Sequence, residues 1–180
     1  MSGQPRTLIL GGARSGKSAH AEALLHGADA VTYVATARPW PGDEDFAHRI
    51  NEHQRRRPAS WVTVDDVDAV DALRDPAVRR TAVLVDDVGT WLTHALDEAG
   101  AWELPRGTLR PRMEALVDAV AAWPGTQPLV LVTPEVGLSV IPEHRSARLF
   151  RDELGWLNAA LAAHCEQVRL IVAGLTLDLK

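Results

Sequence analysis

The chain has 180 residues, of which 46% are hydrophobic, and this composition predicts one folded α/β domain over residues 1–180. Its formal net charge of −5 argues against a general nucleic-acid binder or a membrane-surface protein, since both usually carry a basic excess. Cys165 is the only cysteine, which excludes an internal disulfide and fits a cytoplasmic protein. No apolar run approaches the ~18 residues of a membrane span, and residues 1–6 lack the layout of a signal peptide, so we expect no membrane insertion.

Short apolar runs predict buried strands, and longer segments with helical periodicity lie between them. The expected strands cover residues 7–10, 31–36, 82–86, 129–133 and 169–173, and the expected helices cover residues 17–26, 43–57, 109–123 and 143–166. Residues 97–108 read as a surface connection, and residues 175–180 as an antiparallel edge strand. This alternation indicates a mostly parallel sheet flanked by helices on both faces, with ligands beyond the carboxyl ends of its strands.

Residues 11–18 read G-G-A-R-S-G-K-S and match the phosphate-loop pattern G-x-x-x-x-G-K-S between the first strand and the first helix. Glycines let the backbone N–H groups converge on phosphate oxygens, while Lys17 adds a mobile cation and Ser18 a hydroxyl for Mg²⁺. The expected nucleotide-binding residues here are Gly11, Gly12, Ala13, Arg14, Ser15, Gly16, Lys17 and Ser18. The loop therefore predicts a nucleoside triphosphate bound by a single-domain, RecA-like P-loop NTPase fold.

The strand over residues 82–86 ends in two carboxylates, Asp86 and Asp87. An acid at this place lies beside Mg²⁺ in phosphate-loop enzymes, and Asp86 is the preferred candidate. The alternative is that one or both aspartates cap a helix that begins near Gly89, because Asp is a favoured N-cap residue. Both interpretations stay open at this point.

A helix over residues 43–57 would place His53 between two arginines, since Arg49 and Arg57 are each four residues away. Two guanidinium groups disfavour protonation of an imidazole and attract phosphate, so a neutral, nucleophilic histidine beside a triphosphate is chemically sensible. The alternative is a solvent-exposed helix whose terminal arginines complement the helix dipole and whose histidine has no function. Spacing alone favours this alternative. The other six histidines form no persuasive metal-ligand spacing.

Five stretches together resemble one family: residues 11–18, 33–37 (Y-V-A-T-A), 49–53 (R-I-N-E-H), 57–61 (R-P-A-S-W) and 135–143 (E-V-G-L-S-V-I-P-E). They are similar to the bifunctional adenosylcobinamide kinase/adenosylcobinamide-phosphate guanylyltransferase of cobalamin biosynthesis, and the resemblance covers nearly the whole chain. It implies phosphorylation of adenosylcobinamide with ATP or GTP. It further implies transfer of GMP from GTP to adenosylcobinamide phosphate through a guanylylated histidine, giving adenosylcobinamide-GDP and pyrophosphate. A homo-oligomer, a trimer, is implied as well.

The resemblance also assigns roles to residues of this chain. His53 would be the guanylylated histidine, and pyrophosphate would leave toward Lys17. Ser18 and Asp86 would hold Mg²⁺. Further residues associated with the nucleotide would be Ala35, Thr36, Ala37, Arg49, Gln54, Arg55, Arg56, Arg57, Asp65 and Asp86. Without the resemblance, Asp65 reads as a turn or helix-cap acid.

Four residues depart from the pattern of the family: His94, Pro134 and His144 stand where Asn is common, and Ser139 where Gly is common. We expect these positions in loops or at element ends that face ligand, so they bear on acceptor recognition and kinase competence. Proline at position 134 removes an N–H group and fixes φ, which predicts a reshaped loop after the fourth strand. The alternative is a compensated variant of the family.

Two other functions use the same phosphate loop. One is a small-metabolite kinase without nucleotidyl transfer, and the other is a nucleotide-dependent regulatory binding module. The chain has no Asn-Lys-x-Asp motif for guanine specificity, which weakens the interpretation as a GTPase switch.

Overall fold

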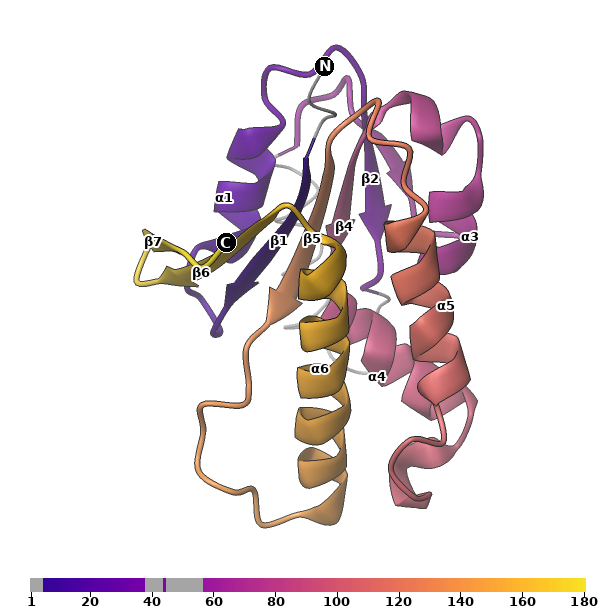
Figure 1. The fold of residues 1–180 in the computed structure, drawn as a ribbon, viewed down its shortest axis with the longest axis vertical. Coiled ribbons are helices and arrows are strands. Elements are labelled where there is room, and N and C mark those ends of the chain that lie inside the picture. Colours follow the sequence, from indigo (N-terminus) through magenta and orange to yellow (C-terminus); the bar gives the residue numbers. More distant parts are fainter. Residues whose placement is uncertain (1–4, 38–43, 45–56) are drawn as a thin grey trace.

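The computed structural model of the protein describes residues 5–37, 44 and 57–180. Within these residues, seven strands form one sheet in the order β3-β2-β4-β5-β1-β6-β7. Neighbouring strands are parallel except β6 and β7, which pair antiparallel (Figure 1). The predicted parallel sheet and the predicted antiparallel strand at its C-terminal edge are therefore confirmed.

The strands are β1 (Arg6–Gly11), β2 (Val31–Ala35), β3 (Val62–Val64), β4 (Ala82–Asp86), β5 (Leu129–Pro134), β6 (Gln167–Val172) and β7 (Leu175–Asp178). The helices are α1 (Lys17–Leu24), α3 (Ala69–Arg74), α4 (Val88–Glu98), α5 (Arg110–Ala121) and α6 (Arg145–His164). Two short 3₁₀ turns, η1 (Val78–Arg80) and η2 (Ala101–Glu103), follow α3 and α4. No helix in the described parts of the chain is both long enough and apolar enough to cross a membrane.

Helices cover both faces of the sheet, so the central strands are buried along most of their length rather than alternating between buried and exposed residues. On one face, a core cluster contains Ile9, Tyr33 and Leu84 of the strands. It also contains Ala21 of α1 and Leu25, the residue that follows α1. On the other face, a larger cluster joins the sheet to α3, α4, α5 and α6 (Figure 1). This layering follows from the apolar runs of β1, β2, β4 and β5, which are buried almost throughout.

The carboxyl ends of the central strands meet at one edge of the sheet. Gly11 of β1 lies opposite Pro134 of β5, and Asp86 of β4 lies opposite Ala35 of β2. One strand, β5, separates β1 from β4. The phosphate loop and Asp86 therefore leave the same edge of the sheet, as the alternation of strands and helices predicts.

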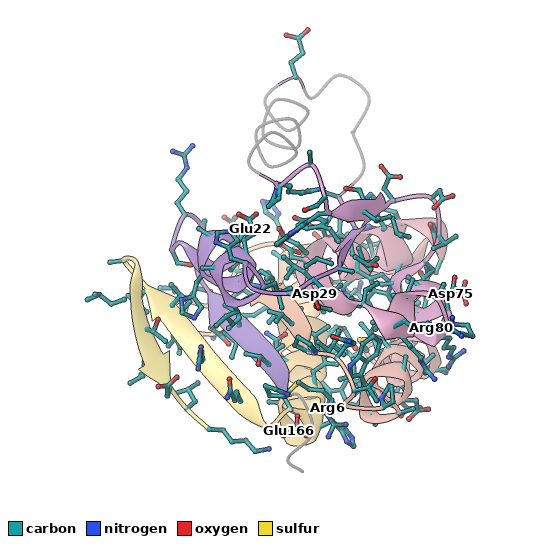
Figure 2. The ribbon with its side chains drawn as sticks, turned by 90° about the horizontal axis from the view of Figure 1, so that it is seen from above. Arg6, Glu22, Asp29, Asp75, Arg80 and Glu166 are labelled. Carbon is teal, nitrogen blue, oxygen red and sulfur yellow. The ribbon has the colours of Figure 1, made fainter. Side chains whose placement is uncertain are left out.

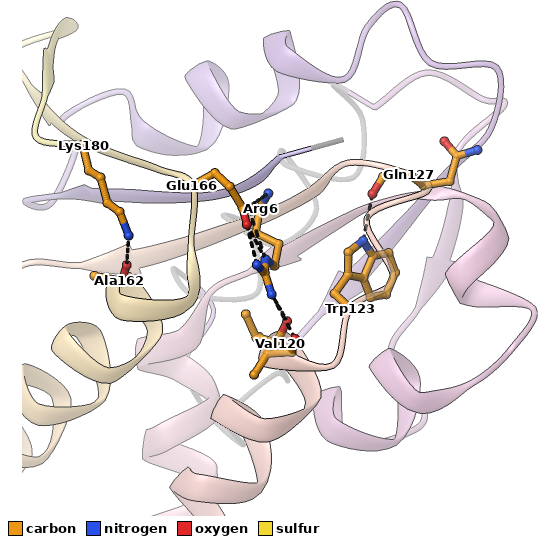
Figure 3. Close-up of polar contacts among 8 residues, drawn as sticks. Arg6, Val120, Trp123, Gln127, Ala162, Glu166 and Lys180 are labelled. Carbon is orange, nitrogen blue, oxygen red and sulfur yellow. Dashed lines mark hydrogen bonds and ion pairs between the residues drawn. The ribbon is translucent and has the colours of Figure 1, made fainter. Parts of the chain in front are cut away.

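At the edge of the sheet where the strands begin, an ion pair joins segments that are far apart in the sequence. The Arg6 guanidinium, at the start of β1, binds the Glu166 carboxylate just before β6 (Figures 2 and 3). The same guanidinium donates to the carbonyl oxygens of Val120 and Ala121 at the end of α5, at 3.4 and 3.0 Å. One arginine thus connects the first strand, the sixth strand and a covering helix.

Some elements differ from the sequence prediction. Strand β3 and helix α3 were not predicted, because β3 has three residues and α3 six, too few to show a period. The predicted connection over residues 97–108 contains η2, in which Ala101 is buried. Arg57 lies in a bend and not in the predicted helix, in keeping with Pro58, which disfavours helical geometry at the residue before it. The rest of that predicted helix lies outside the described residues, except residue 44, which is helical.

Candidate nucleotide site

The phosphate loop has the backbone geometry that its glycines allow. Gly16 has φ of 95° and Arg14 φ of 57°, both in the left-handed region. A side chain at Gly11 would place its Cβ 2.4 Å from the Ser15 hydroxyl oxygen, so position 11 has room only for glycine. The Gly174 N–H, in the turn after β6, donates to the Ser15 carbonyl oxygen at 2.8 Å and holds the loop against the sheet edge.

Helix α1 starts at Lys17, directly after this loop. Its N-cap residue Gly16 has no side chain, so no side-chain oxygen accepts from the first-turn N–H groups. These groups and the positive end of the helix dipole are the usual binding site for a phosphate. The Lys17 ammonium folds back over the loop and donates to the Gly12 carbonyl oxygen at 3.3 Å. The loop thus has the donors and the cation for a triphosphate.

Asp86 ends β4 with its carboxylate turned toward the first turn of α1. The Ser18 hydroxyl donates to one carboxylate oxygen of Asp86 at 3.4 Å. A hydroxyl and a carboxylate are oxygen ligands of the kind that Mg²⁺ prefers, and phosphate oxygens of the substrate complete such a site. Among the described residues no group of three or more His, Cys, Asp or Glu could hold a metal ion. The pair of Ser18 and Asp86 fits a Mg²⁺ that is bound together with a nucleotide.

Asp87 takes the other role that the sequence left open. Its carboxylate accepts from the Thr90 N–H at 2.6 Å and caps the N-terminus of α4. Burial raises the pKa of Asp87, the Asp86 carboxylate raises it further, and the Thr90 N–H and Lys17 act in the opposite direction. The two adjacent aspartates therefore have different roles: Asp86 lies beside Ser18, and Asp87 caps the N-terminus of α4.

Tyr33, in the centre of β2, contacts Asp86 from the neighbouring strand. Its hydroxyl donates to the second carboxylate oxygen of Asp86 at 2.5 Å. Burial and the charge of Asp86 raise the pKa of Tyr33, so the hydroxyl keeps its proton and stays a donor. The Arg57 guanidinium carbon lies 3.2 Å from the centre of the Tyr33 ring, and Arg57 also donates to the Thr63 hydroxyl at 3.3 Å. One aromatic side chain thus fixes both an acid and a cation of the candidate site.

Sequence reasoning did not assign Tyr33 to the site, although it lies in the stretch Y-V-A-T-A of residues 33–37. The one available signal was a tyrosine in an otherwise aliphatic buried strand, because a buried tyrosine hydroxyl needs a hydrogen-bond partner. That partner comes from another strand, so the signal could not name it.

The other described residues that were predicted to bind nucleotide lie around the same edge of the sheet. Thr36 is buried at the end of β2, where its hydroxyl donates to the Asp87 carbonyl oxygen at 2.7 Å and accepts from the Asp87 N–H. Ala35 lies opposite Asp86, and Ala37 follows Thr36. Asp65 is exposed directly after β3. Predicted residues outside the described part of the chain are Arg49, His53, Gln54, Arg55 and Arg56.

Pro134 leaves the sheet intact, although it has no N–H group; the predicted change in the loop after it stays a prediction. Strands β1 and β5 stay in register up to Gly11 and Pro134, and the Glu135 N–H donates to the Gly11 carbonyl oxygen at 3.1 Å. Because successive N–H groups point to opposite sides of a strand, the nitrogen of residue 134 faces β4, whose pairing with β5 has ended at Asp86. The Pro134 ring lies against Gly89, where a Cβ would come within 2.5 Å of it.

The other three departures lie in different surroundings. His94 lies in the middle of α4, not in a loop or at an element end as expected, because α4 continues to Glu98 around its buried residues. It borders a cavity of about 20 Å³ that Ala35 and Thr36 also line. Ser139 lies in the loop after β5 and donates to the Val136 carbonyl oxygen at 2.9 Å. His144 is the N-cap residue of α6, without a capping hydrogen bond from its side chain.

Solved structures confirm the fold class. An ATPase from the type III secretion system of pathogenic bacteria superposes with a TM-score of 0.55 at 15% identity, covering 97% of this chain. The ATPase EscN from enteropathogenic Escherichia coli superposes with a TM-score of 0.58 at 13% identity, covering 94% of this chain. The chain spans about half the length of these two structures, 56% and 43% respectively. At this identity the likeness concerns the fold alone.

Sequence comparisons identify the family. The family model described as cobinamide kinase / cobinamide phosphate guanyltransferase matches residues 7–179. The bifunctional adenosylcobalamin biosynthesis protein CobP of Pseudomonas aeruginosa is 43% identical, over 97% of both chains. Two proteins named CobU, with the same description, are 36% identical in Escherichia coli and 37% in Salmonella typhimurium, over 96% of this chain and 98% of theirs. The chain therefore belongs to the cobinamide kinase / cobinamide phosphate guanyltransferase family, as the motifs of the sequence predict.

Proposed function

We propose that the protein catalyses two successive reactions of cobalamin biosynthesis: phosphorylation of adenosylcobinamide with ATP or GTP, and transfer of GMP from GTP to adenosylcobinamide phosphate. The observation that carries the proposal is a complete phosphate loop, with Ser18 beside Asp86, in a chain that the family model matches from residue 7 to residue 179. Motif, site geometry and family point to the same substrate class, a nucleoside triphosphate.

In the kinase reaction, the loop residues 11–18 and the N-terminus of α1 bind the phosphates of the donor, and Lys17 balances the negative charge that develops during transfer. Ser18 and Asp86 would hold Mg²⁺, which when bound supplies positive charge to the phosphate oxygens. Tyr33 orients the Asp86 carboxylate. The acceptor hydroxyl oxygen forms a bond to the γ-phosphorus as the opposite bond to the departing nucleoside diphosphate breaks, and the hydroxyl loses its proton.

In the guanylyl transfer, His53 is the proposed nucleophile. Its imidazole nitrogen forms a bond to the α-phosphorus of GTP while the bond to pyrophosphate breaks. A phosphate oxygen of adenosylcobinamide phosphate then attacks the same phosphorus and releases the histidine. His53 lies outside the described residues, and its assignment is supported by the R-I-N-E-H motif and by the family. Arg57, held on Tyr33, would bind phosphate oxygens beside it.

A turnover assay tests both halves separately. Adenosylcobinamide and adenosylcobinamide phosphate are each offered with GTP and with ATP, and the corrinoid products are separated by chromatography. We expect adenosylcobinamide to be phosphorylated with either nucleotide. We expect adenosylcobinamide phosphate to receive GMP when GTP is offered and to remain unchanged with ATP. Phosphorylation without any GMP transfer would reduce the function to that of a kinase. Turnover of neither corrinoid would contradict the proposal.

The histidine is tested by substitution and mass spectrometry. His53→Ala should abolish the mass increase of one GMP per chain that GTP alone produces, and should leave GTP affinity by calorimetry within about twofold. His164→Ala, an exposed histidine at the end of α6, is the matched control and should retain the adduct. A GMP adduct of parental yield on the His53→Ala protein would remove His53 from the mechanism.

Three further features belong to this proposal: residues 1–180 acting as one catalytic domain, assembly as a homotrimer, and a cytoplasmic location, where GTP and ATP are available. Family resemblance supports the trimer, and the single cysteine fits a reducing compartment. Light scattering coupled to gel filtration measures the assembly directly, and a monomeric mass would contradict it.

A further inference from the structure

A groove of about 570 Å³ lies between α4, η2 and α6. We name it the α4–α6 groove, and it is lined by Thr93, Trp102, Glu103, Ser146, Ala147 and Phe150. Its volume is within the range of small-molecule sites, which are usually lined by aromatic side chains and a few polar groups. None of the described residues of the nucleotide site lines this groove, so it offers room for a second ligand.

The groove lies on the same side of the molecule as the phosphate loop. Helix α4 begins at Asp87, next to Asp86, and Thr93 lies six residues further along the helix, about 9 Å at 1.5 Å per residue. The N-terminal turns of α6 are reached from β5 by the loop of residues 135–144 (Figure 1). A ligand in the groove would therefore lie beside the nucleotide rather than in its place.

The walls combine aromatic surface with hydrogen-bonding groups at the rim. The ring centres of Trp102 and Phe150 are 6.4 Å apart, and the Trp102 indole N–H donates to Asp97 at 2.6 Å, which fixes its orientation. Glu103 is exposed and its carboxylate lies 3.1 Å from the Arg145 guanidinium. Ser146 adds a hydroxyl in the first turn of α6. Aromatic walls bind apolar faces, and the rim groups can accept from and donate to carboxamides.

The loop of residues 135–144, which leads into α6, carries exposed aliphatic side chains. Leu138, Val140 and Ile141 are 85%, 90% and 72% exposed. The end of the loop is held to α6, since the Arg148 guanidinium donates to the carbonyl oxygens of Pro142 and Glu143. These side chains leave apolar surface exposed in the segment before the N-terminal turns of α6, two residues of which, Ser146 and Ala147, line the groove.

We propose that the α4–α6 groove binds the corrinoid ring of the acceptor. The proposal rests on the function proposed above and assigns its second substrate to a place in the structure. A corrinoid is a broad ring with apolar faces and carboxamide side chains, which matches aromatic walls and a polar rim. Its reactive hydroxyl or phosphate is on a flexible side chain outside the ring, so ring and reacting group can occupy neighbouring sites.

Ala147 allows a test that adds volume without removing any core contact. It is exposed, lies in the first turns of α6 and lines the groove, so Ala147→Trp fills the groove. Ala159→Trp is the matched control, because Ala159 is also exposed on α6 and does not line the groove. The measurements are KM for adenosylcobinamide and for adenosylcobinamide phosphate, GTP affinity by calorimetry, and formation of the GMP adduct from GTP alone.

We expect Ala147→Trp to raise KM for both corrinoids about tenfold or more, with GTP affinity and adduct formation within about twofold of the parental protein. Ala159→Trp should change none of these values. Parental KM values for Ala147→Trp would refute the groove while leaving the proposed function intact. A loss of GTP affinity instead would assign the groove to the nucleotide and also refute the proposal. A parental protein that turns over neither corrinoid would refute the proposed function itself.

Discussion

Tyr33 is the residue at which the acid and the cation of the candidate site meet. Its hydroxyl holds Asp86 at 2.5 Å, and its ring carries the Arg57 guanidinium at 3.2 Å. A hydrogen bond from a buried donor restricts the rotamers of a carboxylate. The carboxylate then loses less conformational entropy when it contacts a metal ion or its ligands. Tyr33 therefore acts as a positioning residue for Asp86 and need not contact substrate.

Tyr33→Phe should raise the Mg²⁺ concentration for half-maximal kinase activity about three- to tenfold, because it removes the hydrogen bond that orients Asp86. The ring under Arg57 remains, so GTP affinity in Mg²⁺-free buffer should stay within about twofold. A Mg²⁺ titration of initial rates measures the effect. Thr32→Val, which removes a buried hydroxyl from the same strand, is the control. An unchanged Mg²⁺ dependence would show that Tyr33 has only a structural role.

At the scale of elements, Asp68 joins three helices that cover one face of the sheet. Its carboxylate caps α3 by accepting from the Val70 N–H at 2.8 Å. It also accepts from the Trp91 indole N–H of α4 and from the Arg112 guanidinium of α5, at 3.1 and 2.9 Å. Only the cap is a local interaction, and the other two contacts depend on packing.

Asp68→Ala should lower the free energy of unfolding by about 2 kcal/mol, because it removes the helix cap and the acceptor of the buried Trp91 indole N–H. Arg112 loses one of its two acidic partners and keeps the ion pair with Glu98. Asp68→Asn should cost less, since Asn is an equally good N-cap residue. Urea denaturation measures both. Asp75→Ala is the control, since the Asp75 carboxylate accepts a local bond from the Ala77 N–H at 2.8 Å. A loss no larger than that of Asp75→Ala would mean that the contacts to α4 and α5 add nothing.

At the scale of the whole molecule, the pair of Arg6 and Glu166 connects β1, β6 and α5 at the amino-terminal edge of the sheet (Figure 3). The hydrogen bond from Arg6 lowers the pKa of Glu166 to about 2 from its usual 4.5. A carboxyl group whose pKa is lower in the folded state stabilises the fold above its unfolded pKa. That contribution is lost as the pH falls from 4.5 toward 2.

Glu166→Gln should lower the free energy of unfolding at pH 7 by about 1 kcal/mol, a small value because the Glu166 side chain is half exposed and screened by solvent. The difference from the parental protein should shrink below pH 4.5 and vanish near pH 2. Thermal unfolding across this pH range measures it. Glu114→Gln, at an exposed position of α5, is the control. A difference that persists undiminished at the lowest pH would contradict the assignment to the Glu166 charge.

The sequence by itself determined the phosphate loop and the acids at the end of β4, because each depends on a short stretch of chain. It also determined the parallel sheet, because apolar runs alternate with helical segments along the chain. A glycine-rich turn, an apolar run and a terminal carboxylate express their geometry through neighbouring residues. The sequence also identified the family, which the relatives confirm over nearly the full chain.

The tertiary structure alone decided which aspartate lies beside Ser18 and which one caps a helix. The order of strands places Asp86 beside Tyr33 of β2 and near Ser18 of α1, while Asp87 turns into α4. It also placed Arg57 on the Tyr33 ring, a contact that the helical spacing does not predict. The α4–α6 groove is formed by two stretches of chain, residues 93–103 and 146–150, which lie more than 40 positions apart. No local pattern contains such contacts, because strand order and helix packing arise from the burial of the whole core.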